Sequence, residues 1–148
     1  MGQGTSKHEP FTPAASVGAE ELSRVVRGKR IIVGVTGGIA AYKTAMVVSK
    51  LAQAGAEVTV AMTEAATHFV SALTFQALSG RAVYTSAWEH IESKDPQHIS
   101  LASAADLALV APCTMDCLAK LATRRTDDVG TLILSAIDRA KTHVLLAP

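Results

Sequence analysis

The feature that constrains this chain most is a short β-branched run that leads directly into a helix-forming segment. Residues 31–35 read Ile-Ile-Val-Gly-Val, which is typical of a strand buried on both faces of a sheet. Residues 39–54 are rich in Ala and contain neither Pro nor Gly, and Gly55 follows where a helix C-cap is expected. A strand joined to a helix in this way predicts the first half of a β–α–β unit.

The same alternation continues along the chain. The apolar runs predict further strands, and the segments between them predict helices, of which the last opens with paired acids that suit a helix N-terminus. Strands alternating with helices form right-handed crossovers and a parallel sheet covered on both faces. We therefore predict an α/β fold, a Rossmann-like (flavodoxin-like) three-layer sandwich. The strands are expected at 57–62, 107–111 and 142–147. Helical pieces that stop at Gly80 are expected at 65–78, and helices at 114–122 and 127–137, while 81–97 stay unassigned.

Composition narrows the class of protein. The 148 residues suit one domain, and 14 Lys and Arg against 13 Asp and Glu leave a net charge of +1 without a long basic run, which argues against nucleic acid as a partner. No apolar stretch approaches the roughly 20 residues that cross a bilayer, so we expect no membrane partner and a cytoplasmic location. Residues 1–27 are rich in Gly, Ser, Thr and Pro and predict a flexible N-terminal extension, apart from a short helix near Glu20–Val26, before a domain at 28–148.

In an open α/β sheet a ligand binds outside the carboxyl ends of the strands, so the loops there are the candidate site. The first loop contains Gly37, Gly38, Ile39 and Ala40 and joins a strand directly to a helix. Free N–H groups and the helix dipole at such a loop favour a phosphate. Two glycines also occur in a tight turn without any ligand, so a phosphate site here has to be supported by the other two loops.

The second and third loops indicate which nucleotide is bound. The spacing GxGxxG of dinucleotide folds is absent, and the second strand is followed by Thr63 rather than directly by an acid, although Glu64 comes next. The Thr63 hydroxyl suits a phosphate oxygen or a helix cap equally well. The third loop, Ala111-Pro112-Cys113-Thr114-Met115-Asp116, leaves a buried strand and could line a flat ring system. One mononucleotide could contact all three loops.

The cysteines and most histidines indicate no further chemistry. Cys113 and Cys117 are neither a disulfide framework nor a four-ligand metal set, so we expect two small buried side chains and no metal site. His68, His90 and His143 are expected to be structural or at the surface.

Several ordered blocks from about Lys29 to Pro148 resemble one known family, the homo-oligomeric flavin-containing cysteine decarboxylases. Within it, the chain is most similar to the phosphopantothenoylcysteine decarboxylases of bacterial coenzyme A biosynthesis. The blocks are Gly34-Val35-Thr36-Gly37-Gly38-Ile39-Ala40-Ala41-Tyr42-Lys43, Met62-Thr63-Glu64-Ala65-Ala66, Gln76-Ala77-Leu78-Ser79-Gly80, His98-Ile99-Ser100-Leu101 with Ala105-Asp106-Leu107, Ala111-Pro112-Cys113-Thr114-Met115-Asp116, and Asp127-Asp128.

The resemblance implies FMN as the cofactor and a cysteine-containing metabolite as the substrate. Its phosphate is expected at Gly38, Ile39 and Ala40 together with Thr63, and its ring near the third loop. In the family the flavin oxidises the cysteine part of phosphopantothenoylcysteine to a thioaldehyde, CO₂ departs, and the reduced flavin returns the electrons. His98 matches the active-site histidine, an acid/base or carboxylate-orienting group that we expect in a loop before a helix.

Two departures from the family pattern bear on activity. Asp116 stands where the family usually has Asn. The sequence ends at Leu146-Ala147-Pro148, where the pattern continues into an Ala-Met-Asn stretch and a clamp bearing a proton-donating cysteine. We therefore expect a domain that is incomplete at its C-terminus and that binds flavin with little turnover.

Three alternatives to the decarboxylase remain open at this point. They are a non-catalytic FMN-binding regulatory or interaction protein, a peptidyl-cysteine decarboxylase and the related flavin prenyltransferase, which the first loop and the His98 segment argue against. Family members assemble as trimers or multiples of trimers. We expect a homo-oligomer here, with Phe69, Phe75 and Trp88 either at the contact or in the core.

Overall fold

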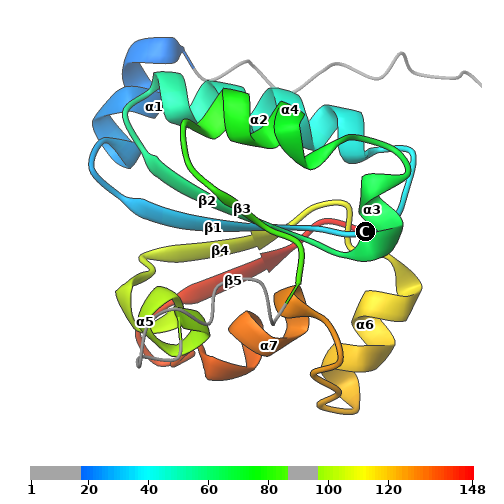
Figure 1. The fold of residues 1–148 in the computed structure, drawn as a ribbon. Coiled ribbons are helices and arrows are strands. Elements are labelled where there is room, and N and C mark those ends of the chain that lie inside the picture. Colours follow the sequence, from blue (N-terminus) through cyan, green and yellow to red (C-terminus); the bar gives the residue numbers. More distant parts are fainter. Residues whose placement is uncertain (1–17, 87–96) are drawn as a thin grey trace, which may run out of the picture.

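The sheet of this protein is all parallel. A computed structural model describes residues 18–86 and 97–148, in which five strands pair in the order β3-β2-β1-β4-β5 (Figure 1). The strands are β1 Arg30–Val35, β2 Glu57–Met62, β3 Val83–Tyr84, β4 Leu107–Val110 and β5 His143–Leu146. The predicted α/β fold with a parallel sheet is thereby confirmed.

Helices cover both faces of the sheet. Figure 1 shows α1, α2 and α4 on one face, α5, α6 and α7 on the other, and the short α3 at the carboxyl edge. This arrangement gives the three layers that the alternating sequence predicts. The helices are α1 Ala19–Val26, α2 Ala41–Gln53, α3 Glu64–Thr67, α4 Ala72–Ser79, α5 Gln97–Ala104, α6 Met115–Ala122 and α7 Val129–Ala136.

The strand order reverses at β1. From β1 the chain adds β2 and β3 on one side, then returns to add β4 and β5 on the other. The loops that follow β1 and β4 therefore diverge to opposite faces, which leaves a crevice at the carboxyl edge between them.

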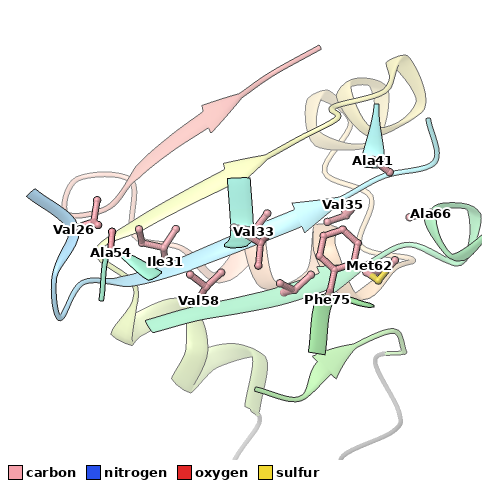
Figure 2. Close-up of a cluster of buried hydrophobic side chains, with 12 residues drawn as sticks. Val26, Ile31, Val33, Val35, Ala41, Ala54, Val58, Met62, Ala66 and Phe75 are labelled. Carbon is pink, nitrogen blue, oxygen red and sulfur yellow. The ribbon is translucent and has the colours of Figure 1, made fainter. Parts of the chain in front are cut away.

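Two apolar layers hold the helices to the sheet. On the α2 and α4 face, Val33, Val35, Val58 and Phe75 pack together (Figure 2). Phe75 is 0% exposed, so the expectation that it could contribute to a contact between subunits is wrong: α4 turns this ring towards the core. Phe69 is 50% exposed, and Trp88 lies outside the described residues.

The helical pieces predicted at 65–78 are the two helices α3 and α4. The Thr63 side chain accepts a hydrogen bond from the Ala66 N–H at the start of α3, and the Ser71 side chain accepts one from the Thr74 N–H at the start of α4. Each hydroxyl marks the start of its own helix, because it accepts from an N–H group of the first turn. The segment left unassigned contributes β3, and its residues 87–96 lie outside the described part.

The short helix expected near residues 20–26 is α1, whose Val26 belongs to the core. The Ser23 hydroxyl donates a hydrogen bond to the Ala54 carbonyl at 3.1 Å, which ties α1 to the end of α2. The boundary between an extension and a domain stays a prediction, because residues 1–17 are not described. Among the described helices, none has the length and apolar character needed to cross a membrane.

Candidate functional site

The loop between β1 and α2, residues 36–40, is called the amide loop below. A Cβ atom added to Gly37 would lie 2.5 Å from the Cβ of Ala65 in α3, which is closer than two such atoms can approach. Gly38 is less crowded, because its added Cβ would lie 3.4 Å from the Pro112 ring. Gly37 is therefore required by the close packing of α3, whether or not a ligand is bound.

The amide loop carries a run of unpaired donors. Within the described part of the chain, the N–H groups of Gly37, Gly38, Ile39 and Ala40 have no acceptor, whereas the Ala41 N–H donates to the Gly38 carbonyl at 2.9 Å. The last of these groups lie at the N-terminus of α2, where the helix dipole is positive. Such a cradle fits the phosphate that the sequence predicts here.

Two buried threonines connect the loop after β4 to the amide loop and to α2 by hydrogen bonds. The Thr36 hydroxyl donates to the Pro112 carbonyl and accepts from the Thr114 N–H at 3.1 Å. The Thr44 hydroxyl donates to the Ala111 carbonyl at 2.7 Å. Sequence analysis did not single out Thr36 or Thr44. The available signal was a hydroxyl at the end of a buried strand and another inside an Ala-rich helix, since buried hydroxyls need partners.

Thr63 follows β2 and lies beside the end of β1, because its N–H donates to the Val35 carbonyl at 3.0 Å. Of the two roles that the sequence left open, the capping of α3 is present, with the Ala66 N–H 3.3 Å from the Thr63 hydroxyl oxygen. The proton of this hydroxyl has no acceptor in the part of the chain that is described. It is available to donate to an anion.

A cavity of about 350 Å³ lies between these loops, close to the lower end of the size range of small-molecule sites. It brings together four of the residues predicted for the site. The other predicted residues of the amide loop and of the loop after β4 do not line it. Its lining is Thr36, Gly37, Thr63, Glu64, Ala65, Thr114, Asp116, Cys117, Lys120, Asp127 and Asp128.

The side of the cavity formed by α6 and the start of α7 is charged. Lys120, whose side chain is 18% exposed, places its Nζ 3.1 Å from Asp116, 3.3 Å from Asp127 and 3.2 Å from Asp128. The hydrogen bond to Asp116 raises the pKa of Lys120 above its usual value. Burial lowers this pKa, and the hydrogen bond to Asp128 raises it further. We call Asp116, Lys120, Asp127 and Asp128 the acidic rim.

The cysteines next to this rim are buried free thiols, as expected from the sequence. Burial, followed by the neighbouring Cys113, raises the pKa of Cys117 from 9.0 to about 12. Burial also raises the pKa of Cys113. A thiol with a raised pKa is a poor nucleophile, so neither side chain contributes covalent chemistry at neutral pH.

His98 lies apart from the other predicted site residues. It is the second residue of α5 rather than part of a preceding loop, and it does not line the cavity. Figure 1 shows α5 at the opposite end of the sheet from α3 and α6. The C-terminal half of α5 lines a different cavity, of about 770 Å³, beside Lys29 and Arg30 at the amino ends of the strands. Within one copy of the chain, α5, which carries His98, thus lies at the other end of the sheet from α3 and α6.

A parallel α/β sheet with an amide-rich loop and a cavity at the point where strand order reverses defines the doubly wound class of α/β proteins. Residues 19–148 match the protein family described as Flavoprotein, and the chain belongs to that family.

Curated relatives resemble the chain over most of its length. It is 46% identical over 120 residues to the coenzyme A biosynthesis bifunctional protein CoaBC of Mycolicibacterium smegmatis. The aligned segment covers 81% of this chain and 28% of that protein. The chain is 44% identical over 124 residues to the protein of the same name from Bacillus subtilis, covering 84% of this chain and 30% of that one. The chain thus spans less than a third of the length of these relatives.

Solved structures share the fold. The FMN-dependent cysteine decarboxylase SpaF superposes with a TM-score of 0.73 and 28% identity, over 81% of this chain and 67% of that one. A mutant PPC decarboxylase complexed with pantothenoylaminoethenethiol superposes with a TM-score of 0.64 and 27% identity, over 82% and 68% of the two chains.

Proposed function

We propose that this chain is the FMN-binding decarboxylase part of a coenzyme A biosynthesis flavoprotein. The reaction is the decarboxylation of 4′-phospho-N-pantothenoylcysteine to 4′-phosphopantetheine. The observation that carries the proposal is the run of four unpaired N–H groups in the amide loop, beside the Thr63 hydroxyl. The 46% identity to a coenzyme A biosynthesis protein supports the choice of pathway.

The residues of the site fit FMN in two parts. The N–H groups of Gly38, Ile39 and Ala40 and the Thr63 hydroxyl are donors for the phosphate, which is doubly charged near neutral pH. The loop Ala111–Asp116, fixed by the hydroxyls of Thr36 and Thr44, lies on the side assigned to the ring. Bound FMN supplies reversible two-electron oxidation of the substrate.

His98 acts, in this proposal, at the site of a neighbouring copy. His98 does not line the cavity of its own chain, and this supports an oligomer, which we propose to be a trimer or a multiple of trimers. Ile39 in the amide loop and Met115 at the start of α6 are 76% and 78% exposed, and apolar side chains of this size are often covered in an assembly. A cytoplasmic location belongs to the same proposal.

A second function is favoured by the same observation about His98. If no other copy supplies a histidine to the cavity, the chain binds FMN without catalysis and acts as a regulatory or interaction protein. The two functions differ in whether His98 affects turnover.

The test begins with the purified chain, its visible absorption spectrum and the mass of any released cofactor. A flavin spectrum and the mass of FMN are expected, and a colourless folded protein that gains no flavin on addition of FMN would refute both functions. The second step measures CO₂ release from phosphopantothenoylcysteine. His98→Asn should abolish turnover and keep the flavin, while His143→Asn, at an exposed position on β5, serves as the matched control. A flavin-loaded wild type whose flavin spectrum does not change on addition of the substrate, and which releases no CO₂ even in a single turnover, would favour the non-catalytic function.

A further inference from the structure

The charges that line the cavity oppose the ligand proposed for it. Glu64, Asp116, Asp127 and Asp128 contribute four carboxylates, and Lys120 contributes the one ammonium group among the described lining residues. A phosphate next to this lining meets net negative charge, and like charges a few ångströms apart repel each other strongly where water is partly excluded. Binding of FMN therefore depends on how these carboxylates are held and neutralised.

Lys120 is placed to hold them. It projects from the last turn of α6 and reaches Asp116 in the first turn of the same helix and Asp128 at the start of α7. One carboxylate oxygen of Asp128 accepts from the Thr131 N–H at 2.8 Å as the cap of α7, and the other accepts from Lys120 at 3.2 Å. Asp128 is thus fixed by α7 as well as by Lys120.

Asp116 depends more on the ammonium group. Its side chain is 75% exposed, and in the described part of the chain Lys120 is its salt-bridge partner. Asp116 also lines the cavity, on the loop and helix that carry the predicted ring-binding residues. Without Lys120 this carboxylate loses its restraint and is free to turn towards the ligand.

We infer that Lys120 is a positioning residue for FMN: it restrains and neutralises Asp116 and its neighbours so that a phosphate-bearing flavin can bind beside an acidic rim. This role rests on the proposed function. It acts through the carboxylates, so its loss should matter for FMN more than for riboflavin, which has the same ring and no phosphate.

The test measures the dissociation constants of FMN and riboflavin for the full chain by quenching of flavin fluorescence. For Lys120→Met we expect FMN binding to weaken by about tenfold in low salt and riboflavin binding by less than about twofold, with the loss for FMN shrinking as salt screens the charges. Lys120→Arg should keep most of the affinity. Lys141→Met removes the same charge from an exposed pair with Asp138 and should leave both constants unchanged.

A rescue variant separates positioning from direct contact. Lys120→Met combined with Asp116→Asn should recover most of the lost FMN affinity, because the unrestrained charge is gone. An unrecovered loss, an equal loss for riboflavin, or no loss at all would overturn the role of Lys120 while leaving the proposed function intact. Failure of the wild type to bind FMN would refute the proposed function and this role together.

Discussion

The amide loop and the acidic rim lie at the same edge of the sheet, yet they are built from different parts of the chain. The amide loop carries backbone N–H groups, and its geometry depends on the absence of a side chain at Gly37. The acidic rim consists of side-chain charges, which Lys120 and the N-terminus of α7 hold in place. The first region is limited by the volume available at Gly37, and the second is organised by the charges around Lys120.

The largest effect is expected from adding one methyl group to the amide loop. Gly37→Ala should lower the free energy of unfolding by about 2–3 kcal/mol, because the new Cβ overlaps Ala65 and α3 must move. Urea unfolding followed by circular dichroism measures this change. Gly38→Ala is the matched control and should cost less than about 1 kcal/mol, since its Cβ finds ordinary contact distances. Neither glycine has a positive φ, so equal losses would show that crowding by α3 does not distinguish them.

A smaller effect is expected from the acidic rim. Asp128→Ala removes a capping box and should lower the free energy of unfolding by about 1 kcal/mol. Asp127→Ala leaves α7 capped and should change stability by less than about 0.5 kcal/mol. The same unfolding experiment compares the two. The idea that the rim is ordered by α7 fails if Asp127 proves as important as Asp128.

The smallest expected effect concerns Cys117, which lies beside the acidic rim. It changes the free energy of unfolding only at alkaline pH. Its folded-state pKa of about 12 lies above the ordinary value of 9.0, so above pH 9 the unfolded chain releases this proton first. The contribution of the protonated Cys117 thiol to the free energy of unfolding is therefore fully present below pH 9. It is lost as the pH rises towards 12, and the loss is on the order of 1 kcal/mol at pH 10. Unfolding midpoints measured from pH 7 to pH 10 should fall less steeply for Cys117→Ala than for the wild type. Parallel pH profiles would contradict the assigned burial effect.

Much of the fold could be predicted because its elements have local causes. The run at residues 57–62 matches β2 residue for residue, since an apolar β-branched segment has few alternatives to a buried strand. The paired acids at the start of the last predicted helix include its cap, Asp128. Helical pieces were predicted for α3 and α4 without the position of the break between them, because the Ser71 cap lies within an otherwise helix-compatible sequence.

Part of the candidate site could be predicted from one rule about parallel sheets. Loops at the carboxyl ends of parallel strands meet at one edge, and this places Gly37, Thr63, Thr114 and Asp116 around one cavity. The rule could not find Lys120, since a lysine near the end of an exposed-looking helix resembles any surface lysine. Nor could it place His98, whose relation to the cavity depends on where α5 packs.

By itself, the sequence determined most of the strands and helices, although not β3 or α5, and it indicated a phosphate site between β1 and α2. These features depend on residue type and on spacing over a few neighbours. Only the tertiary structure decided that Ala65 excludes a side chain at Gly37, that Thr36 and Thr44 fasten the loop after β4, and that one ammonium group serves three carboxylates. The physical reason is that these contacts join residues from different elements. Their distances are set by how the helices pack on the sheet.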